Sequence, residues 1–157
     1  MQMLASRFVP QEQDYISPFD TRVPGFRSGW WGDYFQNTID PDHRPYPFTD
    51  HTGAEAARAL LREHAGFTNR KIGISLPPRA VAVDFIEVRE DLYHPRQGVG
   101  TRVVRLIEAI YPDVTLFAFS EGVDRFWGST GWEFIPRADG DDRPRPLFVL
   151  RREEDGA

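Results

Sequence analysis

A glycine-rich turn holds the residues of this chain best suited to chemistry: Pro95-Arg96-Gln97-Gly98-Val99-Gly100-Thr101. It follows a strand-like pattern over residues 79–88 and opens a helical pattern over residues 99–111. Glycines let a backbone approach a ligand closely, and the unpaired N–H groups of a helix's first turn attract anions. The flanking Arg96 and Arg102 carry planar guanidinium groups that suit phosphate oxygens. We therefore expect this turn to bind a phosphate-bearing ligand.

Two common phosphate-binding signatures are absent from the sequence. The only lysine is Lys71, outside any Gly-x-x-x-x-Gly-Lys-Ser/Thr loop, and Val103 stands where a dinucleotide fingerprint requires its third glycine. A tight turn in an unrelated α/β domain, with no affinity for a phosphate ligand, is the alternative interpretation of the two glycines.

The segment after the helix decides between these interpretations. Residues 114–119 are β-branched and aromatic and predict a buried strand, which Ser120-Glu121-Gly122 ends. Residues 123–134 then predict a short helix ending near Gly131 and another strand. This order resembles the GCN5-related N-acetyltransferases (the GNAT superfamily). In that family the glycine turn holds the pyrophosphate of coenzyme A, and a segment Asn-x-x-Ala-x-x-Phe-Tyr-x-x-x-Gly-Phe completes the site.

The resemblance covers residues 81–135. Ser120 stands at the Asn position of the second motif, Val123 at the Ala position, Phe126-Trp127 at Phe-Tyr and Gly131-Trp132 at Gly-Phe. It implies an α/β fold with a mixed, mostly antiparallel central sheet flanked by helices, and acetyl-CoA as co-substrate. It also implies the residues around that co-substrate: Arg96, Gln97, Gly98, Val99, Gly100, Thr101 and Arg102 at the pyrophosphate, Val88 along the pantetheine arm, and Ser120 and Trp127 at the pantetheine or thioester end.

Three positions depart from the family pattern. The stretch from Val88 to Gly98 is two residues longer than usual, and Pro95 replaces the Arg or Gln that begins the turn. Trp127 replaces the tyrosine that often protonates the departing thiolate. Tyr93 and His94 are the nearest groups that could take over this proton transfer, and a surface histidine without a role is the alternative.

Acetyl transfer to an amine requires a base, because the amine arrives protonated. By resemblance, a carboxylate on the strand before the turn plays this part, so Glu87 and Asp84 are the candidates. A carboxylate within an apolar strand is costly to bury unpaired. An internal salt bridge from Asp84 to an arginine is therefore the alternative to a catalytic role.

The resemblance therefore implies an N-acetyltransferase that moves an acetyl group from acetyl-CoA to a primary amine by direct attack in a ternary complex. The alternative is a non-catalytic acyl-CoA-binding or interaction module on the same fold. The acceptor is a small-molecule or peptide amine, with polyamines, amino acids, antibiotics and protein N-termini all open. Residues 81–157 carry the whole net charge of −5. They either attract a cationic amine or form an ordinary solvated face.

The 157 residues predict one domain, residues 1–157, with the acetyl-CoA-binding half at residues 79–151. The aromatic-rich segment 1–50 either covers a sheet face or dimer seam or forms a wall of the substrate pocket, with a short helix over residues 28–38. Further along the chain the sequence predicts several elements: a helix over residues 56–64, opened by a capping box at Thr52–Glu55 and ended by Gly66, a strand over residues 71–76, a polar loop over residues 137–146 and a last strand over residues 147–151.

Composition excludes several other classes of protein. Without cysteine there is no disulfide, thiolate metal site or cysteine nucleophile, and His43, His51 and His64 are too scattered for a metal triad, so we predict no metal. The acidic balance argues against general nucleic-acid binding. No signal peptide or membrane-length apolar run is present, so we expect a cytoplasmic protein without a membrane partner. The aromatic content is compatible with a homodimer.

Overall fold

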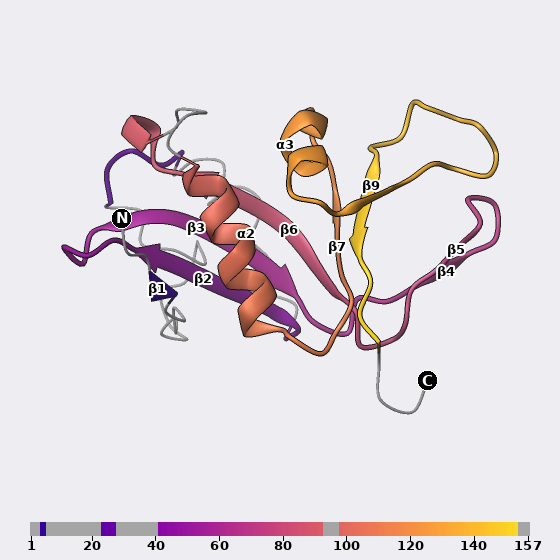
Figure 1. Ribbon diagram of the computed structural model, residues 1–157, viewed down its shortest axis with the longest axis horizontal. Helices are drawn as coiled ribbons and strands as arrows, with labels where there is room; N and C mark the ends of the chain where they lie inside the picture. Colours follow the sequence, from indigo (N-terminus) through magenta and orange to yellow (C-terminus); the bar gives the residue numbers. More distant parts are fainter. Residues whose placement is uncertain (1–3, 6–22, 28–40, 93–97, 154–157) are drawn as a thin grey trace. The chain divides into compact units, whose positions relative to one another are not determined.

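The computed structural model describes residues 4–5, 23–27, 41–92 and 98–153 (Figure 1). The chain forms two compact units, Met1–Leu61 with Phe85–Leu106 and Arg62–Asp84 with Ile107–Ala157, which we call the first and the second unit. The helix expected over residues 28–38 lies outside the described residues, as do Tyr93, His94, Arg96 and Gln97.

Among the described residues, the first unit contains four strands, in whole or in part, and the N-terminal part of one helix. Its strands are β1 (Leu4–Ala5), β2 (His43–Thr49), β3 (Glu55–Arg62, all but its last residue) and the second half of β6 (Val81–Val88), hydrogen-bonded in the order β1-β2-β3-β6. β1 and β2 are antiparallel, with Leu4 opposite Thr49. β6 leads through the 3-10 turn η1 (Glu90–Leu92) toward α2 (Val99–Ile110). The sequence predicted this strand and this helix in the same order.

The helix expected over residues 56–64 is wrong, because this segment is strand β3. Its alanines, leucines and arginines are good helix formers. However, Ala56 to Leu61 are buried without interruption, on both faces of the strand, as befits a strand in the interior of a sheet. Burial by neighbouring strands therefore overrides local propensity here.

The presumed capping box is the turn of the β2–β3 hairpin. Asp50 Oδ1 accepts hydrogen bonds from the main-chain N–H groups of Thr52 (2.8 Å) and Ala54 (3.2 Å). Gly53 supplies the left-handed conformation, with φ of +85°. The Ser/Thr-x-x-Glu pattern at Thr52–Glu55 thus marks a turn and not a helix start.

The second unit contains the first half of β6, β7 (Leu116–Phe119), β9 (Leu147–Leu150) and β8 (Glu133–Ile135) in the order β6-β7-β9-β8. β6 and β7 are parallel, whereas β9 is antiparallel to β7 and to β8. Helix α3 (Asp124–Ser129) lies between β7 and β8 in the chain (Figure 1). These elements match the predicted order, and the sheet mixes parallel and antiparallel strands as expected.

A separate antiparallel hairpin, β4 (Thr68–Asn69) with β5 (Ile74–Ser75), belongs to the same unit. The strand predicted over residues 71–76 is correct only for Ile74 and Ser75, because the N–H of Gly73 bonds to the carbonyl of Arg70 and closes a turn. Nine buried side chains form the core of this unit: Ala65, Ile72, Ile74, Leu76, Ala80, Ala82, Phe117, Leu147 and Val149.

The prediction that Gly66 ends a helix is wrong, because the segment before it is a strand and not a helix. Gly66 is a point of close backbone approach instead. A Cβ at this position would lie 1.8 Å from the carbonyl oxygen of Pro77. Only glycine therefore lets the chain before β4 pass Pro77, which lies two residues after the end of β5. Within the described ranges no helix is both long and apolar enough to cross a bilayer.

Candidate functional site

The N-terminus of α2 has the geometry of an anion site. Gly98 adopts φ of +64°, and its carbonyl accepts the N–H of Arg102 at 3.1 Å, so Gly98 caps the helix. The N–H groups of Val99, Gly100 and Thr101 precede the first N–H that has an intrahelical acceptor. They are therefore available to a phosphate, with the positive end of the helix dipole behind them.

Position 98 requires glycine because of its backbone angle, and not because a side chain would lack space. A Cβ there would meet nothing within 4 Å, but φ of +64° is strained for residues with side chains. Buried Val99, Val103 and Val104 anchor the helix, while Arg102 is exposed. Of the residues predicted to hold the pyrophosphate, the structure thus brings together Gly98 to Arg102. This donor set fits a pyrophosphate.

The two candidate bases have different surroundings. Asp84, in the second unit, forms a bidentate ion pair with Arg62, with Nε–Oδ2 at 3.1 Å and Nη2–Oδ1 at 3.4 Å. This is the salt bridge that the sequence left as an alternative. Glu87, in the first unit, accepts the main-chain N–H of Arg27 at 2.9 Å through Oε2. Val88, half-buried, ends β6 next to it.

Ser120 organises the start of α3. Its buried hydroxyl donates to Asp124 Oδ1 at 2.6 Å and accepts the N–H of Val123 at 3.1 Å. The side chain is thus committed to holding the turn between β7 and α3. Trp127 is buried, and its ring lies 5.0 Å from that of Trp132 and 5.2 Å from that of Phe126.

Trp132 carries a feature that sequence reasoning missed. Its indole Nε1 is buried and forms no hydrogen bond within the described part of the chain. A buried donor without a partner costs about 1–3 kcal/mol. An acceptor oxygen of a bound molecule would remove this cost. In the sequence, Trp132 stands only at a motif position, and nothing in its neighbours signals an unpaired donor.

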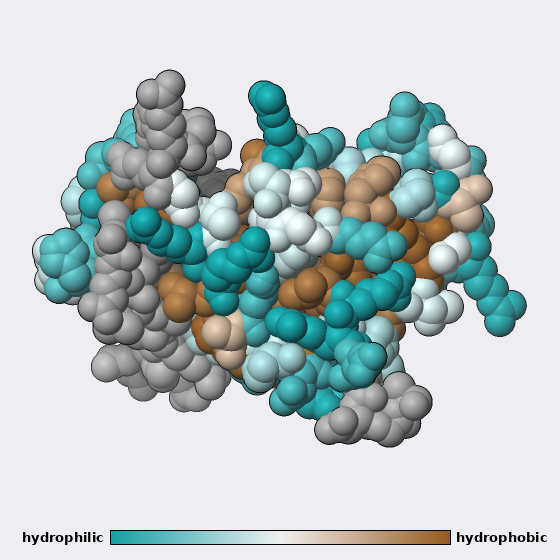
Figure 2. Space-filling model, viewed as in Figure 1, coloured by the Kyte–Doolittle hydropathy of each residue, from teal (hydrophilic) through white to brown (hydrophobic). Residues whose placement is uncertain are grey.

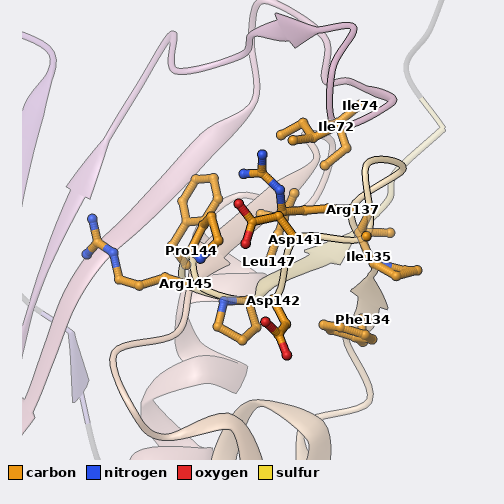
Figure 3. A pocket seen from close by; sticks show the side chains of 14 residues that line it. Ile72, Ile74, Phe134, Ile135, Arg137, Asp141, Asp142, Pro144, Arg145 and Leu147 are labelled. Atoms are coloured by element: carbon orange, nitrogen blue, oxygen red, sulfur yellow. The ribbon is translucent and has the colours of Figure 1, made fainter.

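The loop between β8 and β9, predicted only as a polar loop, borders a cavity of about 380 Å³ (Figure 3). Two ion pairs within the loop each join residues two positions apart. Arg137 Nη2 lies 2.6 Å from Asp139 Oδ2, and Arg143 Nη2 lies 2.9 Å from Asp141 Oδ2. Because Arg137 and the N–H of Asp141 both donate to Asp139, its pKa falls to about 2. The bond from Arg143 likewise lowers the pKa of Asp141.

Among the described residues, no three His, Asp or Glu side chains are close enough together to hold a metal ion.

Solved structures of acetyltransferases share this architecture. The histone acetyltransferase HPA2 and related acetyltransferase from Corynebacterium glutamicum is 10% identical, with a TM-score of 0.55 over 83% of this chain and 76% of that one. The KacTA–DNA complex contains a chain with a TM-score of 0.55 and 13% identity, over 95% of this chain and 92% of that one. Aminoglycoside acetyltransferase AAC(6')-Ib, solved with coenzyme A, is 18% identical, with a TM-score of 0.51 over 71% of this chain and 67% of that one.

No family model matches the sequence, and no curated protein matches it. The structural similarity shows that the chain has the fold of the acetyltransferases that its sequence resembles, which confirms the predicted fold class.

Proposed function

We propose that this protein is an N-acetyltransferase that moves the acetyl group of acetyl-CoA to a primary amine by direct attack in a ternary complex. The observation that carries the proposal is the left-handed Gly98 at the start of α2, after which the N–H groups of Val99, Gly100 and Thr101 have no acceptor inside the helix. The fold that this chain shares with an acetyltransferase solved with coenzyme A supports it.

In this proposal the main-chain N–H groups of Val99, Gly100 and Thr101 bind the pyrophosphate, and Arg102 adds positive charge. Arg96 and Gln97 would complete the turn. Val88 would pair through its main chain with the pantetheine arm. Acetyl-CoA would supply the acetyl group as an activated thioester.

Glu87 is the better candidate for the base that removes a proton from the amine. Both oxygens of Asp84 face the guanidinium of Arg62, so a substrate amine would have to compete with an ion pair for them. His94 would return a proton to the thiolate. Ser120 and Trp127 would shape the pantetheine end through packing, because the Ser120 hydroxyl is already bonded to Asp124.

The acceptor in this proposal is a small-molecule or peptide amine and not nucleic acid. One structural neighbour is part of a DNA complex, but the net charge of −5 on this chain opposes general binding to a polyanion. AAC(6')-Ib is an aminoglycoside acetyltransferase, and aminoglycosides are amines.

Thermal unfolding with acetyl-CoA, coenzyme A and ATP tests the proposed binding site. Ligand at about a hundred times its dissociation constant stabilises by about 2.7 kcal/mol, which raises the melting temperature by about 5 to 10 °C for a chain of this length. Gly100→Asp should abolish the rise, because a carboxylate in the first turn repels phosphate. Gly100→Asn, whose side chain has the same shape as that of Asp but no charge, should retain part of the rise. An absent rise at millimolar coenzyme would refute the proposal.

The second candidate is a non-catalytic module that binds acyl-CoA. It is favoured by Trp127, a buried indole at the position where the family often places its proton-donating tyrosine. Turnover of acetyl-CoA with a panel of amines separates the two. For the enzyme, Glu87→Gln should lower kcat about 10²-fold or more without changing the melting rise with coenzyme. Binding without turnover for every amine would favour the module.

A further inference from the structure

The cavity of about 380 Å³ lies wholly within the second unit and has an apolar lining. Figure 3 shows Ile72 and Ile74 entering it from the β4–β5 hairpin and Phe134 from β8. Phe119 of β7 and Leu147 of β9 also contribute. Cavities that bind small ligands start at about 300 Å³. The volume therefore suits a compact organic molecule.

Two aromatic side chains of this cavity are left exposed. The described residues include three exposed large hydrophobic side chains, Phe119 (37%), Val123 (39%) and Phe134 (52%), and the two phenylalanines both line the cavity. Figure 2 shows hydrophobic residues (brown) at the surface among hydrophilic ones (teal). Covering exposed aromatic surface is favourable because it removes apolar area from water. The two rings therefore favour a ligand with an apolar group.

The charges around the cavity are paired except for one. Arg137 pairs with Asp139, Asp141 with Arg143, and Arg145 with Glu121. In Figure 3, Arg145 points away from the other labelled side chains. Asp142 also lines the cavity, is exposed, and forms no ion pair within the described part of the chain.

Asp142 therefore leaves one uncompensated negative charge at the cavity. Figure 3 places its carboxylate on the side of Phe134. A ligand with an apolar group for the aromatic rings and a single positive charge for Asp142 would satisfy both features.

Main-chain hydrogen bonds already hold the loop between β8 and β9, which carries Asp142, in place. Asp139 Oδ1 accepts the N–H of Asp141 at 3.0 Å, and Asp141 Oδ1 accepts the N–H of Arg143 at 3.1 Å. The N–H of Ala138 bonds to the carbonyl of Ile72 at 3.2 Å, which ties the loop to the β4–β5 hairpin. A preformed wall lowers the entropic cost of binding.

We propose that this cavity binds a primary amine that carries a compact aryl or alkyl group, with the ammonium at Asp142 and the apolar group against Phe119 and Phe134. That this ligand is the acetyl acceptor rests on the proposed function. Phe119 directly precedes Ser120, which the family resemblance places at the pantetheine or thioester end. The binding itself is independent of acetyl transfer.

Ligand-observed NMR and calorimetry with three molecules of one tail test the proposal: 4-phenylbutylamine, 4-phenylbutanol and 4-phenylbutyrate. The amine should bind at least tenfold more tightly than the carboxylate, with the alcohol between them. Asp142→Asn should weaken the amine about two- to fivefold, the range of an exposed charge pair, and leave the alcohol unchanged. Phe134→Ala should weaken all three.

Two exposed residues outside the cavity provide matched controls, Asp113→Asn and Val123→Ala, and neither should change any of the affinities. Equal affinity for amine and carboxylate, or no binding at 10 mM, would overturn the proposal. So would a dimer in sedimentation that Phe134→Ala dissociates, because a second copy would then occupy the aromatic surface. Amine binding without any melting rise on acetyl-CoA would leave the cavity proposal intact and refute the proposed acetyltransferase.

Discussion

Arg137 and Asp139 show how two neighbouring residues set the charge state of a loop. The guanidinium donates to both carboxylate oxygens, at 2.9 Å from Nε and 2.6 Å from Nη2. Together with the N–H of Asp141, these bonds lower the pKa of Asp139 from 3.8 to about 2. Because the folded pKa lies below the unfolded one, this pair stabilises the fold above pH 3.8, and the stabilisation is lost as the pH falls toward 2.

Replacing Arg137 by Gln should therefore raise the pKa of Asp139 toward its ordinary value, because the strongest donor to the carboxylate is removed. An NMR titration of the carboxyl carbon of Asp139 between pH 2 and pH 6 measures the change. Arg125→Gln, at an exposed position in α3, is the matched control and should leave the titration as it is. A midpoint that stays near pH 2 in Arg137→Gln would show that the main-chain bond alone suffices.

At the scale of single residues, the sequence predicted the kind of chemistry better than the contacts. The glycine turn indicated an anion site because helix starts and glycine angles depend on local geometry, and Gly98 does cap α2. The sequence left two roles for Asp84, a catalytic base or a member of a salt bridge. It could not decide between them because the partner, Arg62, is 22 residues away in the chain. The pairing of Ser120 with Asp124 and the unpaired Nε1 of Trp132 depend equally on the packed structure.

Two glycines illustrate different constraints at the scale of strands and turns. At Gly66 an added Cβ would lie 1.8 Å from the carbonyl oxygen of Pro77 and 2.4 Å from its carbon, so the backbone would have to move. At Gly53, in the β2–β3 turn, nothing lies within 4 Å, and only φ of +85° resists a side chain.

Gly66→Ala should therefore lower the free energy of unfolding by about 3 kcal/mol through overpacking. Gly53→Ala should lower it by about 1 kcal/mol through backbone strain alone. Urea unfolding of the two variants measures both changes, and Gly53→Asn, with a residue that tolerates positive φ, should lose less than Gly53→Ala. Equal losses at Gly66 and Gly53 would mean that β4 and β5 move apart at little cost.

Most elements after residue 79 were predicted correctly because their patterns are strong. The apolar, β-branched residues of β6, the buried valines of α2 and the aromatic run of β7 each favour a single structure. β3 was misread because its eight residues have helical composition and a turn that imitates a capping box. The β4–β5 hairpin was only partly predicted, since each strand is two residues long and shows no period.

At the scale of the whole molecule, the chain passes between the two units within single elements. Residues 81–84 of β6 belong to the second unit and residues 85–88 to the first, and α2 is divided after Leu106. A strand and a helix that continue from one unit into the other couple their unfolding, because neither element can be half lost without breaking its own hydrogen bonds. We propose on this ground that residues 1–157 are one cooperative domain.

Amide hydrogen exchange tests this cooperativity with Gly66→Ala, whose substitution lies in the second unit. If the chain unfolds as one, a loss of about 3 kcal/mol accelerates exchange about a hundredfold at protected amides of β9 in the second unit and of β3 in the first. Acceleration confined to β9 would instead mean that the second unit opens alone. In that case β6 would break between Asp84 and Phe85, and ligand binding in the 380 Å³ cavity would protect the second unit only.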